Sequence, residues 1–225
     1  PAIDLVRRAV TLAAVAERGV LEVDTDRDQY ERDTDRFELQ SWVRSALAGA
    51  VTAEELRLLT VPVGELGDDL AQCDAALIEA TAIGWALGVV PGDRLPVPQD
   101  GAAEEALLAW MPAPWADLDR LARRMEPRDE EAIAIERERW ELWFWRAVDA
   151  DENDGSIGEV VTDLSKADII PTAGGDFATD AAEPFDQLTP EEQEEIALLA
   201  EHRLLALNWV CGFGTGPDDV PLYPD

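Results

Sequence analysis

Apolar residues recur at spacings of three and four along most of the chain, which is the period of an α-helix that buries one face. The pattern is clearest over residues 66–90, where it forms a stripe of Leu70, Cys73, Leu77, Ala80, Gly84 and Leu87. It predicts further helices over residues 4–21, 37–47, 102–111, 117–125 and 128–148. Asp4 stands where the cap of the first of these is expected.

Two more helices are predicted from their first residues. Thr52 and Thr189 are each followed three positions later by glutamate, the pattern of a capping box. Pro190 adds a residue that favours the first helical position. These signals predict helices over residues 52–59 and 189–210.

The remaining stretches lack a clear period. Residues 24–35 are highly charged, and we expect a solvated acidic loop over this range. Residues 149–189 are rich in Gly and Asp, so we expect a second, long loop with one short strand over 159–162. Residues 212–225 form an irregular tail. The predicted fold is all-α, an irregular multi-helix bundle with long acidic loops, at most one small strand pair, and a single domain over 1–225.

The formal charge of −31 produces a negative field over most of the surface. Such a field repels phosphate backbones and anionic headgroups, so we expect no nucleic-acid and no membrane partner, and a basic protein is the more plausible one. Lys166 is the only lysine among 18 basic residues. High acid with little lysine is also typical of a salt-adapted organism, so the acidity has two interpretations.

The start of the chain resembles a secretory signal, because Arg7 and Arg8 precede an apolar run. That run is short and contains Thr11, which favours an amphipathic helix. No run approaches the roughly 20 apolar residues that span a bilayer. The expected location is the cytoplasm. Cys73 and Cys211 are expected to be structural thiols in apolar helical surroundings.

The sequence contains no phosphate loop, zinc pattern, nucleophile elbow or dinucleotide fingerprint. His202 is the single histidine, and no carboxylate of its own helix is placed to orient it, which disfavours a catalytic histidine. Acidic runs from Asp24 and from Asp149 imitate calcium loops, but neither has glycine at the sixth position. We therefore expect no metal and no cofactor.

Two charges stand alone in apolar stretches. Glu79 is the only charged residue between Ala75 and Gly92, and Arg146 lies among Trp143, Phe144 and Trp145. A buried charge needs a partner, so we predict that Glu79 and Arg146 form an internal ion pair. The alternative is a polar pocket for a ligand or partner.

The last predicted helix has a narrow polar stripe, since Glu194, Glu201 and Asn208 are spaced by seven. A buried asparagine near the apolar end would need specific hydrogen-bond partners. Asn208 is therefore expected to have a structural role, tying down the irregular C-terminal tail.

Three blocks resemble the bacterial family catalogued as domain of unknown function 4272. They are Arg8-Ala9-Val10 with Ala14-Val15-Ala16 and Gly19-Val20-Leu21-Glu22; Glu79-Ala80 with Gly84-Trp85-Ala86-Leu87-Gly88; and Ala206-Leu207-Asn208-Trp209 followed by Asp218-Asp219-Val220-Pro221. In the family a Glu-Arg-His run precedes the last block, whereas here Leu204 stands at the histidine position. The family name assigns no activity, so the resemblance implies architecture rather than chemistry.

These observations favour a non-enzymatic, acidic protein-interaction or binding domain. The alternative is a hydrolase or transferase that uses Glu79, Glu201 or Asp219 in a pocket of the bundle. A pocket gathering those acids with Arg146 would favour the enzyme, and an exposed acidic or aromatic patch would favour binding. The candidate binding residues are Glu79, Arg146, Glu201, Asn208, Trp209 and Asp219.

Overall fold

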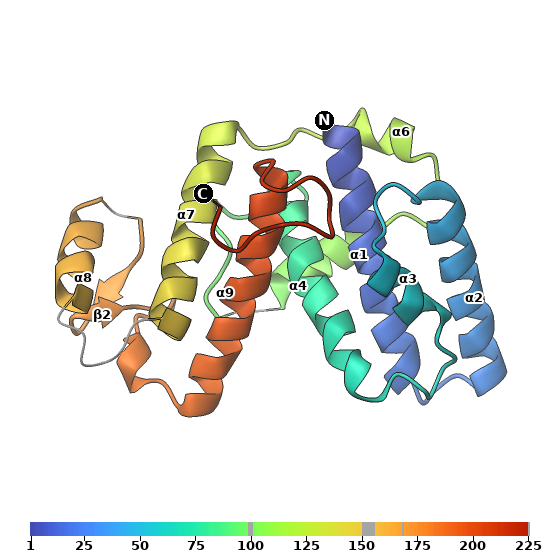
Figure 1. Ribbon diagram of the computed structural model, residues 1–225, viewed down its shortest axis with the longest axis horizontal. Helices are drawn as coiled ribbons and strands as arrows, with labels where there is room; N and C mark the ends of the chain where they lie inside the picture. Colours follow the sequence, from blue (N-terminus) through green and yellow to red (C-terminus); the bar gives the residue numbers. More distant parts are fainter. Residues whose placement is uncertain (99–100, 150–155, 168, 225) are drawn as a thin grey trace.

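The computed structural model describes residues 1–98, 101–149, 156–167 and 169–224. Across these residues the protein is 63% helical, with nine α-helices and one sheet of two short strands. The predicted all-α class with at most one small strand pair is therefore confirmed. Figure 1 shows an elongated molecule in which α1–α6 occupy one half and α7–α9 the other.

Helix α1 (Ala2–Val23) packs lengthwise against α4 (Leu70–Ala86) near the middle of the molecule. Gly19 permits this close approach, because a Cβ there would lie 2.7 Å from the Cβ of Cys73. Asp4 is not the cap of α1, since the helix begins at Ala2 and Asp4 lies in its first turn, where a carboxylate still favours the helix dipole.

Helix α2 (Gln29–Ala46) begins at Gln29 rather than at residue 37, so the loop expected over residues 24–35 is wrong for its second half. Asp28 caps the helix by accepting from the amide of Glu31 at 2.9 Å, and Glu31 accepts in return. The charged residues are the solvent-facing first turns of a capped helix, which explains their lack of apolar period.

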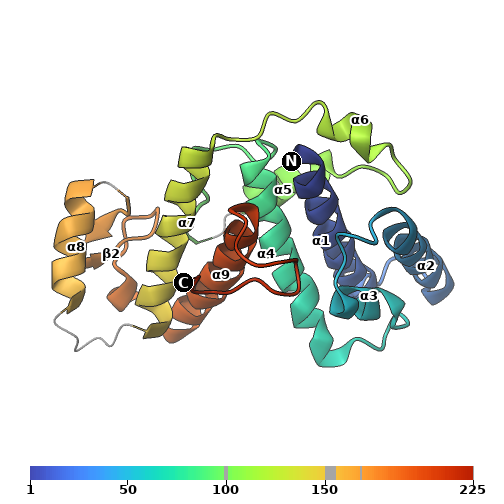
Figure 2. The same ribbon diagram turned by 45° about the horizontal axis from the view of Figure 1, so that its top comes forward.

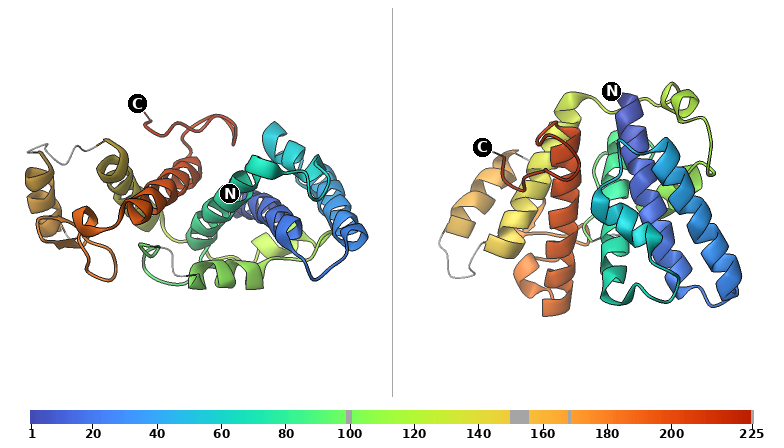
Figure 3. Two further views of the ribbon diagram at one scale, coloured as in Figure 1. Left: turned by 90° about the horizontal axis from the view of Figure 1, so that it is seen from below. Right: turned by 45° about the vertical axis from the view of Figure 1, so that its right-hand side comes forward.

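Both capping boxes expected at threonines are confirmed. Thr52 opens α3 (Ala53–Thr60), and Thr189 opens α9 (Pro190–Val210) with proline in the first turn. Figure 3 shows α9 between α4 and α7 (Glu130–Phe144), and Trp145–Asp149 continue α7 as a π-helical turn.

The segment expected as a loop over residues 149–189 holds a further helix, α8 (Ser156–Ala167), so the strand expected over 159–162 is wrong. Apolar side chains at Ile157, Val160, Val161 and Leu164 recur at helical spacing and pack on the core. The β-branched run suggested a strand, but packing against the rest of the protein decides such short segments.

The two strands follow α8. Strand β1 (Thr172–Ala173) pairs antiparallel with β2 (Asp176–Phe177), with Thr172 opposite Phe177. A 3₁₀ turn at Phe185–Gln187 leads to α9. These elements lie at the far end of the molecule beyond α7 (Figure 1).

Short elements complete the other half: a 3₁₀ turn at Gly67–Asp69, α5 (Ala102–Trp110) and α6 (Leu118–Ala122). Figure 2 shows α6 beyond the end of α1, joined to α7 by an extended segment. In the described part of the chain, no helix combines the length and the apolar character that crossing a membrane requires.

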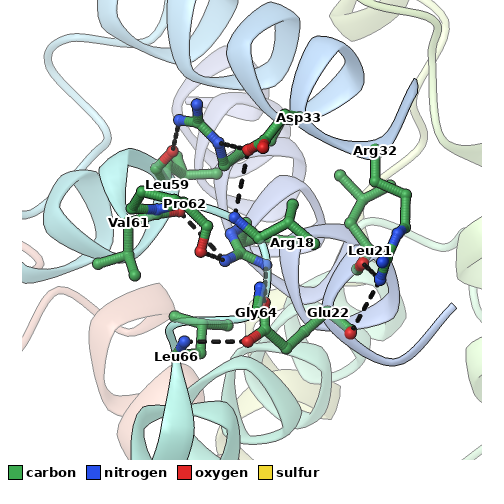
Figure 4. A network of polar contacts seen from close by, with 12 residues as sticks. Arg18, Leu21, Glu22, Arg32, Asp33, Leu59, Val61, Pro62, Gly64 and Leu66 are labelled. Carbon is green, nitrogen blue, oxygen red and sulfur yellow. Dashed lines mark hydrogen bonds and ion pairs between the residues drawn. The ribbon is translucent and has the colours of Figure 1, made fainter. Parts of the chain in front are cut away.

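Polar side chains fix the junction between α1, α2 and the segment after α3 (Figure 4). Arg18, whose side chain is fully buried, donates to the carbonyls of Val61 and Pro62 at 3.1 and 3.0 Å and to Glu22 at 2.9 Å. Glu22 accepts from the amides of Gly64 and Leu66. Asp33 of α2 also accepts from the amide of Val63 at 3.2 Å, so one arginine and two carboxylates hold this loop against α1 and α2.

Candidate functional site

Four ionisable side chains from four helices meet where the two halves of the molecule face each other. Nη1 of Arg8 on α1 donates to Oε2 of Glu55 on α3 at 2.7 Å and to the carbonyl of Ala50 at 3.1 Å. Nη2 of Arg8 lies 3.6 Å from Oε2 of Glu79 on α4. The other oxygen of Glu79 lies 2.9 Å from Nδ1 of His202 on α9. We call Arg8, Glu55, Glu79 and His202 the Arg8 cluster.

Glu55 is placed by the start of α3. Its Oε2 accepts from the amide of Thr52 at 2.9 Å, and its own amide donates to the Thr52 hydroxyl at 3.1 Å. The same carboxylate oxygen receives Arg8. The capping box therefore both begins a helix and orients the anion that holds the buried guanidinium.

The contact between Glu79 and His202 joins the two halves. Because a carboxylate accepts hydrogen bonds, Nδ1 donates to Glu79, and in the neutral imidazole this leaves Nε2 as the nitrogen that can accept. Nε2 makes no hydrogen bond within the part of the chain that the structure describes. A histidine oriented in this way can take up a proton from a bound molecule.

An open cavity of about 400 Å³ lies against the Arg8 cluster. Its apolar wall includes Leu12, Val15, Leu58 and Leu198. A smaller cavity of about 180 Å³ is also lined by Arg8 and Glu79, together with Trp209 and Asp218. Pro217 lines both, so the C-terminal tail borders the site.

With a neutral His202, the Arg8 cluster has two carboxylates and one guanidinium. Arg8 serves both Glu55 and Glu79, and these three side chains are 7%, 12% and 20% exposed. The 3.6 Å separation is too long for a hydrogen bond, so Glu79 is the less compensated carboxylate. Glu54 at the rim is already paired with Arg57, whose hydrogen bond lowers the pKa of Glu54.

The predicted ion pair between Glu79 and Arg146 is wrong. Arg146 instead makes a bidentate pair with Asp176 of β2, through Nε at 2.8 Å and Nη2 at 2.7 Å, and it stacks over Phe185. Both Glu79 and Arg146 do have a charged or polar partner, as the high cost of burying an unpaired charge requires. The partner of Arg146 lies in a segment expected to be a loop, where no pattern distinguishes Asp176 from the other acidic residues.

The structural role predicted for Asn208 is confirmed. Asn208 is fully buried, and its Nδ2 donates to the carbonyls of Pro221 and Leu222 at 2.8 and 3.0 Å. Its Oδ1 accepts from Nε of Arg137 at 2.7 Å. The side chain therefore fastens the tail that borders the two cavities.

The other predicted site residues are not gathered at the Arg8 cluster. Trp209 lines only the smaller cavity, and the half-buried Glu201 is not among the residues that line either one. Asp219 is exposed and accepts from the hydroxyl of Thr215 at 2.9 Å, within a turn of the tail. Of the predicted site residues, Glu79 belongs to the Arg8 cluster, with Arg8 and His202 as its partners in place of Arg146.

Sequence reasoning missed Arg8 and Glu55, and it set His202 aside. For His202 only carboxylates of its own helix were considered, whereas Glu79 comes from a distant helix. A usable signal existed for Arg8, an arginine on the apolar face of the first helix.

The expectation that both cysteines are structural thiols holds for Cys73. This side chain is buried, and burial raises the pKa of its thiol to about 11. Cys211, by contrast, is exposed at the end of α9.

Among the described residues, no group of three His, Cys, Asp or Glu side chains is placed to hold a metal ion. In the first run that imitates a calcium loop, Arg27 pairs with Asp24 and Asp35, and Asp28 caps α2. Residues 150–155 of the second run lie outside the described residues.

Comparisons with protein-family models, with curated proteins and with solved structures find no match to this chain. The resemblance to the domain of unknown function 4272 therefore stays a prediction.

Releasing the tail is expected to cost stability locally. Asn208→Asp keeps the acceptor for Arg137 but loses both donors to Pro221 and Leu222, and should destabilise the protein by about 1–3 kcal/mol, the cost of leaving buried polar groups unpaired. Limited proteolysis should then cut residues 212–224 much faster than in the wild type. Equal protection of the tail in both proteins would contradict this anchoring role.

Proposed function

We propose that this protein is a non-enzymatic binding domain that recognises a basic partner protein and takes one of its lysine or arginine side chains into the cavity at the Arg8 cluster. The observation that carries the proposal is the under-compensated carboxylate of Glu79 on a cavity of about 400 Å³ with an apolar wall. A cavity that gathered Glu201, Asp219 and Arg146 would have favoured an enzyme. None of these three residues lines this cavity.

The two kinds of wall suit the two parts of a basic side chain. Lysine and arginine bury their methylene stems against apolar surface while their charged head stays in polar surroundings. Leu12, Val15 and Leu58 offer the apolar surface. Glu79 offers an oxygen that Arg8 leaves without a hydrogen bond. A guanidinium can bind a carboxylate through two parallel hydrogen bonds, so arginine is the better fit.

The charge of the whole chain supports the same partner. A formal charge of −31 speeds the approach of a basic protein and repels nucleic acids and anionic membranes. The attraction is screened by salt, so the association rate should fall as ionic strength rises. The proposal keeps the cytoplasmic location expected from the sequence.

His202 makes a direct test available, because a single histidine gives one set of imidazole NMR signals. Acetyl-Gly-Arg-Gly-amide should shift those signals saturably, and the analogue with neutral citrulline in place of arginine should not. Glu79→Gln should weaken binding of the arginine peptide by about tenfold, or about 1.4 kcal/mol. Glu194→Gln removes the same charge from an exposed position and should bind like the wild type.

Equal binding of the arginine and citrulline peptides would overturn the proposal, as would an unchanged affinity after Glu79→Gln. Loss of affinity in the Glu194→Gln control would show that the overall charge, and not this cavity, is responsible. A lysine peptide tested alongside reports which basic side chain is preferred.

The pair of Glu79 and His202 supports a second candidate, a hydrolase or transferase. With Glu79 on Nδ1, Nε2 could take a proton from water as its oxygen attacks a bound substrate, and Glu79 would stabilise the imidazolium. His202→Gln discriminates the two functions. The amide can still donate to Glu79, so peptide binding is expected to remain, whereas a reaction that needs a base would be lost.

A further inference from the structure

Helix α6 and the turn that follows it carry three arginines that the fold does not use. Arg120, Arg123 and Arg124 are exposed, and their side chains make no hydrogen bond or ion pair within the described part of the chain. Among the described arginines, only Arg44 and Arg94 also lack such a partner. Residues 120–125 contain no acid, so this segment is locally basic in a chain whose formal charge is −31.

The three arginines lie on one side of a helical turn. Leu118 and Ala122 are buried, so they define the side of α6 that faces the protein. The helical path continues beyond α6, because the amide of Arg124 donates to the carbonyl three positions back at 2.9 Å. At 3.6 residues per turn, positions 120, 123 and 124 project within roughly a quarter of a turn of one another, opposite the buried pair. They therefore form one exposed basic face.

The acidic residues near this face do not neutralise it. Asp117 caps α6 by accepting from the amide of Arg120 at 2.9 Å, and Asp119 lies 3.6 Å from Nη2 of Arg7. Glu126 is exposed and forms no ion pair with another described residue. The positive charge of the face is therefore available to a partner.

Trp115 adds a large apolar side chain just before α6. It is 54% exposed, and its φ of 68° lies in the left-handed region that glycine adopts most easily. Its turn follows Pro114 and is closed by the amide of Ala116, which donates to the carbonyl of Ala113 at 3.2 Å. A bulky residue in this conformation is strained, and an indole more than half exposed gains little packing to offset that strain. Such strain is typical of residues that serve a function.

We propose that this surface docks an acidic segment of a partner protein. We call Trp115, Arg120, Arg123 and Arg124 the α6 patch. Carboxylates of the segment pair with the three guanidinium groups, and a neighbouring apolar side chain packs on the indole. Tryptophan and arginine are among the residues that most often dominate the free energy of protein–protein binding. No residue of the patch lines either cavity at the Arg8 cluster, so this surface is separate from the site of the proposed function.

The charge of the rest of the chain favours an acidic protein segment over a nucleic acid. A nucleic acid carries a negative charge at every phosphate, so a strand longer than the patch would enter the negative field of the protein. An acidic segment can confine its carboxylates to the few residues that meet the arginines. Salt screens the repulsion between the remaining surfaces beyond about 8 Å at physiological ionic strength. The patch therefore fits a partner whose negative charge is local.

NMR of the full chain tests the docking with acetyl-Leu-Glu-Glu-Glu-amide, which has one apolar side chain and three carboxylates. The peptide should shift saturably the indole N–H signal that Trp115→Gly removes. Acetyl-Leu-Gln-Gln-Gln-amide has the same length without the charges and should bind about tenfold more weakly, because it forms no ion pair with the arginines. Oligothymidylate should bind no better than this neutral peptide.

Calorimetry of variants ties the binding to the patch. Arg123→Gln should weaken the acidic peptide about threefold, the loss expected for one exposed ion pair. Trp115→Gly should weaken it about tenfold and yet unfold at the wild-type temperature or above, since glycine relieves the strained backbone. Arg57→Gln is the matched control. It removes one exposed positive charge outside the patch, where Arg57 pairs with Asp69, and should bind normally.

Equal binding of the acidic and neutral peptides, or of oligothymidylate and the acidic peptide, would overturn the proposal. An unchanged affinity in Arg123→Gln would do the same. A dimer of the free protein that Trp115→Gly abolishes would also overturn it, by assigning the patch to a second copy of this chain. Glu79→Gln should bind the acidic peptide normally, so this test is independent of the function proposed for the Arg8 cluster.

Discussion

Asp176→Ala is expected to destabilise the protein by about 3–5 kcal/mol, the range for breaking a buried ion pair. The Asp176 and Arg146 side chains are 5% and 4% exposed and share two hydrogen bonds. Asp176 also accepts from the amides of Phe177 and Asp186, so removing it strands a buried guanidinium and two amides. Urea denaturation followed by circular dichroism measures the loss.

The double-mutant cycle tests the pairing itself. Arg146→Met should also destabilise, but Arg146→Met with Asp176→Ala should lose about 1–3 kcal/mol less than the sum, because no charge is then left stranded. Arg146→Met combined with Glu79→Gln should be additive, since these two residues have different partners. Coupling to Glu79 in place of Asp176 would contradict the observed geometry.

Helices with local signals could be predicted closely. The capping boxes at Thr52 and Thr189 fix their helices within a residue or two, because the cap and its partner are three positions apart. The kind of contact that Asn208 makes was also predictable, since a buried amide needs hydrogen-bond partners and the tail is the nearest irregular segment. The capping boxes join residues three positions apart, and the Asn208 contacts join residues 13 and 14 apart, within the end of one helix and the tail that follows it.

The Arg8 cluster could not be predicted in the same way. Arg8 and Glu55 are 47 residues apart, and Glu79 and His202 are 123 apart. Their meeting depends on how α1, α3, α4 and α9 pack, which no local pattern encodes. The same reason explains Arg146, whose burial was evident from its apolar neighbours but whose partner was set by the path of the chain after α8.

Arg18→Met is expected to cost about 3–5 kcal/mol as well, because it removes the cation beside Glu22 and leaves the carbonyls of Val61 and Pro62 without this donor. Figure 4 shows Arg18 at the centre of the contacts that hold residues 61–66 against α1 and α2. Arg57→Met is the matched control. Arg57 forms exposed pairs with Glu54 and Asp69, so its loss should change the unfolding free energy little.

The pH dependence of the same variant identifies the partner. Burial alone would raise the pKa of Glu22, but the hydrogen bonds from the Gly64 and Leu66 amides and from Arg18 together lower it below its ordinary value of 4.5. A lowered pKa in the folded protein means that Glu22 stabilises the fold above about pH 4.5 and loses that contribution as the pH falls through the folded value. Without Arg18 the pKa of Glu22 should rise, so Arg18→Met should begin to lose this contribution at a higher pH than the wild type. Parallel curves of unfolding free energy against pH for the two proteins would show that Arg18 does not act through Glu22.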